Sequence, residues 1–395
     1  MNKVIMKQVA GLFTAVAAVL ATVTAQAGFF PPAAGSPGST AVPADDAGIE
    51  AWADAYTDYQ PGLAVDAEFQ TPEKSVGEAG NSDGTNSGYT FDIVSLGRGG
   101  SITLTFATPV VDGVGYDFAI FENSFSDTFL ELATVEVSSD GINFVQFPAM
   151  SLTASPVNGF GTVYASDVEQ IAGKYRGGFG TPFDLAILDG NPLLDVNHVT
   201  HIRLTDIVGD GTVPNDISLQ VVADWAGLTV AELPGFVVDA TNAAPGVIYD
   251  PYPTSGSAGF DLDAVAALNQ LTTVLVDIQP GDSNNEVNPD STGTMAVAVL
   301  TTDTGSGEAV TFDATDIDPA SIKFSFADAA PVGGASNTDV DGDTDPDASF
   351  DFNIQDTGLT CDDTSATITG ETFSGVPFSG SDFVTPIDCD SDGCH

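Results

Sequence analysis

The sequence predicts an all-β protein that consists of two antiparallel β-sandwich domains of the jelly-roll type in tandem. Short segments of strand length, either alternating or continuously apolar, recur along the chain. The 42 glycines and 23 prolines are scattered without a period, as tight turns between short strands require. Helical spacing is rare: we expect a turn or two only around residues 49–56 and in DLDAVAALNQ at 261–270.

The first 27 residues are typical of a cleaved secretory signal peptide. Lys3 and Lys7 precede an apolar run, and small residues at 25–27 suit a signal peptidase. No later stretch approaches the roughly 18 consecutive apolar residues of a membrane span. We therefore expect an exported protein, secreted or at the cell surface, that does not insert into the membrane.

The first domain is expected over residues 28–270. Its predicted strands are, in order, SITLTF (101–106), YDFAIF (116–121), ATVEVSS (133–139), NFVQF (143–147) and HIRLTDIV (201–208). Turn signals separate them, and the helices that a parallel α/β fold would need are missing. This order favours an antiparallel sandwich.

The second domain is expected over residues 271–395. Strand-like segments lie at 272–278, 294–302, 321–326, 348–354 and 365–372, and acidic turns separate them. The pattern predicts a smaller, acidic β-sandwich.

Several motifs carry a resemblance to known proteins. The segments LGRGGSITLTFATPV, YDFAIFENSF, LATVEVSSDGINFVQFP, AGKYRGGFGTPFDLA and IYDPYPTSGSAGFDLDAV, which together cover roughly residues 85–268, resemble a family of uncharacterised secreted or cell-surface bacterial proteins, some with a PEP-CTERM sorting tail. This chain departs from those relatives because it ends at His395 without such a tail. The hairpin VEVSSDGINFVQF is similar to that of galactose-binding-like jelly rolls, and this resemblance implies a ligand-binding sandwich, often with structural calcium. Residues 276–300 resemble a β-domain of unassigned role that is appended to secreted bacterial proteins.

The charge balance restricts the partners. The chain has 56 acidic and 8 basic residues and a net charge of −48. Nucleic acids and anionic membranes need a basic face on their partner, so both are excluded. The acidic surface serves solubility, calcium binding, or both.

The stretch DVDGDTDPD at 339–347 is the most concentrated acidic segment. It is not an EF-hand, because Thr344 stands where that loop needs glycine and Phe350 where it needs glutamate. The open alternatives are a calcium loop of another kind and a solvated acidic hairpin, and we favour the calcium loop. Magnesium is less suitable than calcium, because it requires a stricter octahedral geometry. The candidate ligands are Asp339, Asp341, Asp343, Asp345 and Asp347.

Oxygen-bearing side chains also gather at predicted strand ends of the first domain. Glu122 and Asn123 follow the strand 116–121, and Asp250 and Asp261 flank the loop PYPTSGSAGF. They either hold a hard cation or cap turns. Tyr249 and Tyr252 are candidates to stack on a sugar ring, whereas Phe260 is expected in the core.

The C-terminal cysteines leave three possibilities. Cys389, Cys394 and His395 form C-x-x-x-x-C-H, a lengthened haem-attachment pattern. A disulfide suits an exported protein better, and it joins either Cys361 to Cys389 or Cys389 to Cys394.

These observations favour an exported, non-enzymatic binding or surface-structural protein that calcium stabilises and that binds glycan or extracellular matrix. One alternative is a calcium-dependent glycan-active enzyme, with paired carboxylates such as Glu122 and Asp250 about 5–10 Å apart. The other is a redox protein that carries haem at its terminal cysteines. No nucleophile-elbow motif supports a hydrolase.

Overall fold

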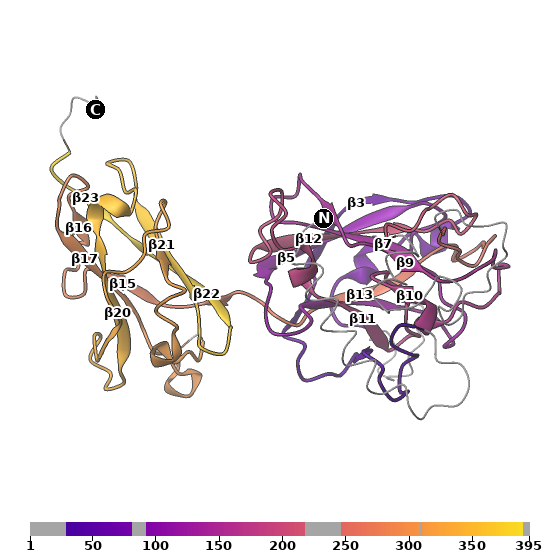
Figure 1. Cartoon of the computed structure of the whole chain (residues 1–395), viewed down its shortest axis with the longest axis horizontal. Helices are drawn as coiled ribbons and strands as arrows, with labels where there is room; N and C mark the ends of the chain where they lie inside the picture. The colour runs from indigo at the N-terminus through magenta and orange to yellow at the C-terminus, as the bar shows by residue number, and fades with distance from the viewer. Residues whose placement is uncertain (1–28, 81–91, 218–245, 309, 390–395) are drawn as a thin grey trace. The chain divides into compact units, whose positions relative to one another are not determined.

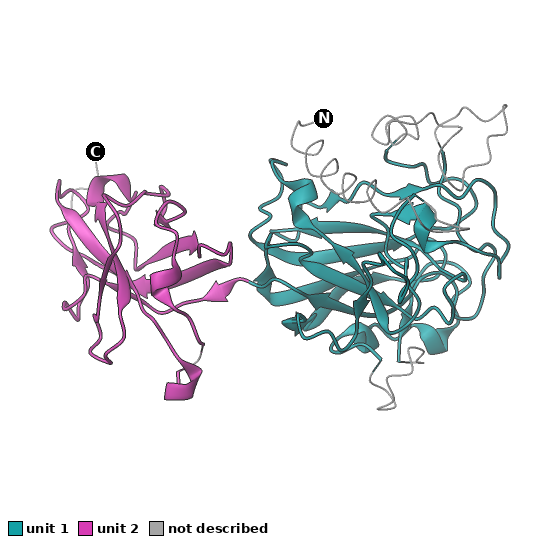
Figure 2. Cartoon of the chain, turned by 60° about the horizontal axis from the view of Figure 1, so that its bottom comes forward, with its two compact units in different colours: residues 1–270 teal, residues 271–395 magenta. Residues whose placement is uncertain are grey.

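The computed structural model describes residues 29–80, 92–217, 246–308 and 310–389. The predicted signal peptide, Cys394 and His395 lie outside these residues. The chain divides into two compact units, unit 1 (residues 1–270) and unit 2 (residues 271–395), which Figure 2 colours separately. Within the described residues, no helix is both long and apolar enough to cross a membrane.

Unit 1 contains two antiparallel sheets (Figure 1). The first has the order β1-β11-β6-β13-β2, with β4 also paired to β13, and the second has the order β3-β5-β12-β7-β8. A separate pair joins β9 to β10. The bounds are β1 Val42–Pro43, β2 Ala51–Trp52, β3 Ala55–Gln60, β4 Val94–Ser95, β5 Ser101–Val110, β6 Phe118–Glu122, β7 Ala133–Ser138, β8 Val145–Gln146, β9 Met150–Ser151, β10 Val168–Glu169, β11 Phe179–Phe183, β12 Val199–Asp206 and β13 Asp261–Ala267.

The two sheets of unit 1 share one hydrophobic core. Ile202 and Leu204, two residues apart on β12, are buried there together with Phe118 and Ile120 of β6. This alternation follows from the period of two along a strand. The first sheet also buries its other face, where Phe121 packs in a second cluster, so β6 and β13 are buried on both sides. The all-β sandwich prediction is confirmed.

The prediction of helical turns in two segments is wrong. Residues 261–267 form β13, which is buried along its whole length between β6 and β2, and residues 49–56 contain β2 and the start of β3. The alanines of β13 favour helix only weakly, whereas burial of both faces of a central strand gains much more. Tertiary packing therefore overrides local propensity.

Unit 2 is a second sandwich, with sheets β14-β22-β21-β18 and β15-β17-β20-β19 around a phenylalanine-rich core. Two short pairings, β14 with β22 and β16 with β23, are parallel, and the others are antiparallel. The bounds are β14 Thr272–Thr273, β15 Val276–Ile278, β16 Glu286–Val287, β17 Thr294–Val299, β18 Lys323–Phe324, β19 Ser336–Thr338, β20 Asp347–Asn353, β21 Ser365–Glu371, β22 Pro377–Phe383 and β23 Thr385–Pro386.

The described helices are single 3-10 turns. They are η1 Ala67–Phe69, η2 Pro72–Ser75, η3 Ala165–Asp167, η4 Leu185–Leu188, η6 Thr304–Ser306, η7 Ala314–Asp316 and η8 Ile354–Asp356.

Strand register brings acidic residues to one end of the unit 1 sandwich. Glu122 ends β6 opposite Leu262 near the start of β13, and Asp206 ends β12 opposite Ala133 at the start of β7. The two sheets meet at this end, because the backbone N–H of Phe260, just before β13, donates to Asp206.

Candidate functional site

A pocket of about 250 Å³ opens at this end of unit 1. Three chain segments form it: the loop from β6 to β7, the loop around residue 160, and the segment that leads into β13. Its lining is acidic, hydroxyl-bearing and aromatic, and consists of Glu122, Asn123, Ser124, Phe125, Phe129, Glu131, Gly159, Phe160, Pro253, Thr254, Ser255, Ser257 and Asp261.

Three buried carboxyl groups, those of Glu122, Glu131 and Asp261, line this pocket. Oε2 of Glu122 accepts a hydrogen bond of 2.9 Å from the backbone N–H of Ser124. Oδ1 of Asp261 accepts one of 2.5 Å from the hydroxyl of Ser95. Glu131 is only 4% exposed, and its Oε1 has no hydrogen-bond partner among the described residues.

Burial dominates the electrostatics of these groups. Desolvation, followed by the charge of Asp261, raises the pKa of both Glu122 and Glu131 well above the usual range. Desolvation raises the pKa of Asp261 to about 7, although hydrogen bonds from Ser95 and Ser257 oppose it. The pocket therefore disfavours ionisation of its own carboxyl groups.

Asp206 and Asp250 lie behind the pocket and hold its walls. Asp250 accepts from the backbone N–H of Leu132, and Asp206 accepts from those of Gly99 and Phe260. Desolvation raises the pKa of Asp206 to about 7 and that of Asp250 well above its usual range. These bonds fix the strand ends from which Glu131 and Asp261 project.

Three phenylalanines form a stack beside the carboxyl groups, here called the phenylalanine ladder: Phe125, Phe129 and Phe160. The ring centroids of Phe125 and Phe129 are 4.8 Å apart, and those of Phe129 and Phe160 are 5.6 Å apart, both in stacked orientation. Phe125 is 58% exposed and Phe160 is 88% exposed. Large aromatic side chains in this position offer apolar faces to a ligand.

Close loop contacts hold the ladder against the rest of the pocket. A Cβ added at Gly159 would lie 2.2 Å from the carbonyl oxygen of Pro253, so only glycine allows these two loops to approach so closely. The hydroxyl of Ser124 shares its one hydrogen between the carbonyl oxygens of Ser126 and Phe129. The pocket is thus largely pre-formed.

The structure brings some of the predicted site residues of unit 1 together. Glu122, Asn123 and Asp261 line the pocket, whereas Asp250 is 1% exposed and is not among the lining residues. Neither predicted tyrosine lines it. Tyr249 packs against an apolar cluster, and the ring of Tyr252 lies 5.5 Å from the guanidinium of Arg98.

Sequence reasoning missed Glu131 and the phenylalanine ladder. Phe125 and Phe129 occur in the polar, turn-rich segment ENSFSDTF, where exposed aromatic residues are a usable signal. Nothing local marks Glu131, because its neighbours in the pocket come from distant segments. Phe260 is buried in the core as expected.

The acidic loop of unit 2 connects β19 to β20 as a hairpin, in which Thr338 is paired with Asp347. Asp339, Asp341 and Asp347 each bring one carboxylate oxygen within 4.8 Å of the others. Asp343 and Asp345 are outside this group, and the side chain of Asp343 accepts from the backbone N–H of Asp345. Desolvation and the neighbouring aspartates raise the pKa of Asp341.

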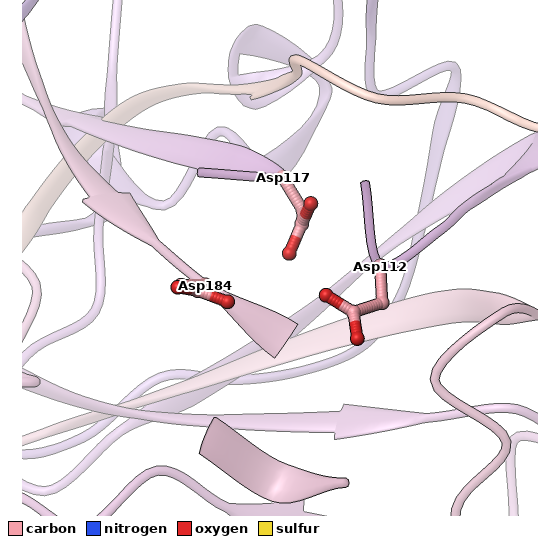
Figure 3. A group of neighbouring side chains, drawn as sticks. All are labelled: Asp112, Asp117 and Asp184. Atoms are coloured by element: carbon pink, nitrogen blue, oxygen red, sulfur yellow. The ribbon is translucent and has the colours of Figure 1, made fainter. Parts of the chain in front are cut away.

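A third acidic group, which sequence reasoning missed, consists of Asp112, Asp117 and Asp184 in unit 1 (Figure 3). Asp117 is fully buried and accepts from the backbone N–H groups of Gly113 and Leu185 and from the side chain of Asn269. Its hydrogen bonds identify it as a structural tie between loops. Among the described residues, this group and the acidic loop are the two sets whose three oxygens lie within 4.8 Å of one another, so the pocket carboxyl groups are more widely spaced.

The cysteine alternatives are resolved in part, because Cys361 and Cys389 form a disulfide with a Cα–Cα distance of 5.9 Å. Cys389 is therefore not free for haem attachment.

Comparison with family models gives no match for the chain. Comparison with curated proteins gives none either.

Proposed function

We propose that this chain is an exported, non-enzymatic binding protein whose unit 1 binds a carbohydrate of a glycan or extracellular matrix in the pocket beside the phenylalanine ladder. The observation that carries the proposal is the ladder itself: three stacked rings, two of them exposed, next to carboxyl and hydroxyl groups. A sugar ring presents apolar C–H faces and polar edges, and this pocket is complementary to both.

The glycan-active enzyme is the weaker alternative. The pair suggested by the sequence does not flank one open space, because Glu122 lines the pocket and Asp250 does not. A glycosidase of the usual kind needs both carboxyl groups to reach the same bond. Binding without turnover requires only the complementary surface.

The experiment is a glycan array probed with the full mature chain, followed by titration of the best ligand. Phe160→Ala removes the most exposed ring, and Phe373→Ala removes a comparably exposed phenylalanine in unit 2 as the matched control. We expect Phe160→Ala to weaken binding by about tenfold, as for loss of an aromatic contact worth 1–2 kcal/mol, and Phe373→Ala to leave it unchanged. Equal affinities of wild type and Phe160→Ala would place the ligand elsewhere.

We further propose that calcium stabilises unit 2 at the acidic loop. Its support is the convergence of oxygens from Asp339, Asp341 and Asp347, which repel one another unless a cation lies between them.

A further inference from the structure

We propose that the carbohydrate bound in the unit 1 pocket is cationic, namely a sugar with a free, protonated amine such as a glucosamine residue, and that Glu131 receives the ammonium group. This rests on the proposed carbohydrate binding and adds the chemical class of the ligand.

The charge of the lining is the first support. The pocket is lined by three carboxyl groups and by no lysine, arginine or histidine. A cation that enters lowers the free energy of their ionised forms, whereas an anionic sugar would raise it further. The chain as a whole, at −48, also disfavours an anionic polymer.

The second support is the orphan oxygen of Glu131. This side chain is almost wholly buried and lines the pocket, yet its Oε1 has no hydrogen-bond partner among the described residues. A buried carboxyl oxygen without a partner is costly, so a donor from a ligand compensates it. An ammonium group has three N–H donors and a positive charge, which makes the strongest such bond.

Size and spacing favour an amine over a bare metal ion. The three pocket carboxyl groups do not bring one oxygen each within 4.8 Å of the others, as the two acidic groups described above do. They therefore do not converge as the ligands of one metal ion would. The volume of about 250 Å³ is slightly below the range of about 300–1,000 Å³ typical of drug-sized ligands, which suits one sugar residue. The phenylalanine faces attract a cation as well.

The test is calorimetric titration of the full mature chain, treated with EDTA, at physiological salt. The probes are the glucosamine trisaccharide, its N-acetylated counterpart, a neutral glucose trisaccharide, and trilysine, which matches the charge of the first probe without its sugar faces. We expect the glucosamine trisaccharide to bind at least about tenfold more tightly than each of the other three, because it alone combines sugar faces with charge-assisted hydrogen bonds.

Two variants locate the effect. Glu131→Gln keeps the shape of the side chain but cannot ionise when a cation binds, and we expect it to weaken binding of the glucosamine trisaccharide by about tenfold or more, while binding of the N-acetylated sugar changes little. Glu68→Gln, the same substitution at an exposed glutamate of unit 1, is the matched control and should bind as wild type.

The outcomes separate the two proposals. Equal binding of the amino, N-acetylated and neutral sugars would overturn the cationic ligand but retain carbohydrate binding. Failure of all three sugars would overturn both. Binding of trilysine as tight as that of the amino sugar would overturn the proposed sugar ligand and reduce the effect to general charge attraction.

Discussion

At the scale of single residues, burial rather than sequence neighbourhood sets the chemistry of the acidic side chains. Asp263 of β13 illustrates this, since its carboxyl is buried against the sheet and accepts a bond from the backbone N–H of Gly80. Desolvation raises its pKa to about 7, and the charge of Asp92 adds to the shift. In the unfolded chain the same group titrates near pH 4.

This difference predicts how stability depends on pH. Between about pH 4 and pH 7 the folded state keeps a proton on Asp263 that the unfolded state has lost, so the stability of unit 1 falls as pH rises through this window. Each such group contributes a slope of about 1.4 kcal/mol per pH unit. Asp263→Asn keeps an acceptor for the backbone N–H of Gly80 but cannot titrate, so it should reduce the slope of stability against pH by about 1.4 kcal/mol per pH unit.

Urea unfolding in EDTA measures this slope. Unit 2 contains no tryptophan and Trp52 lies on β2, so tryptophan fluorescence follows unit 1. Asp66→Asn, the same substitution at an exposed residue of unit 1, should leave the slope unchanged. An Asp263→Asn slope identical to that of wild type would mean that this carboxyl is ionised in the folded state.

At the scale of elements, the hairpin between β19 and β20 contains five aspartates, and a bound cation would relieve their mutual repulsion. If calcium binds it, the ion stabilises unit 2 by about 2.7 kcal/mol at a concentration one hundred times its dissociation constant. Asp341→Asn should abolish the stabilisation, because Asp341 supplies one of the three converging oxygens. Asp290→Asn, at an exposed aspartate elsewhere in unit 2, should retain it.

Differential scanning calorimetry with calcium and with EDTA is the appropriate measurement, because unit 2 contains no tryptophan or tyrosine. A unit 2 melting temperature that is the same in both conditions would show that the loop is a solvated hairpin.

At the scale of the whole molecule, net charge is the dominant feature. At −48, the folded chain repels itself, and salt screens this repulsion. Raising the sodium chloride concentration from 10 to 150 mM shortens the screening length from about 30 to about 8 Å. We therefore expect both melting transitions to rise with salt, with choline chloride equally effective because the effect is not specific to sodium. Transitions that fall over this range would indicate that attractive ion pairs dominate instead.

Local pattern alone determined the class of fold and strands such as β5, β7, β12 and β20, because period-two apolar alternation and frequent turn residues are properties of neighbouring residues. It also identified the acidic loop, whose converging aspartates lie within nine residues. It was wrong for residues 261–267, where weak helical propensity competes with burial on both faces of the sheet.

Only the tertiary structure decided which groups share the pocket. Glu131, Phe160 and Asp261 meet because the three segments that carry them, far apart in the sequence, reach the same end of the sandwich. In the folded chain, Asp250 instead accepts a hydrogen bond from the backbone N–H of Leu132, and the ring of Tyr252 lies beside the guanidinium of Arg98. Pairing between strands far apart in sequence depends on burial summed over both sheets, and no single segment contains that information.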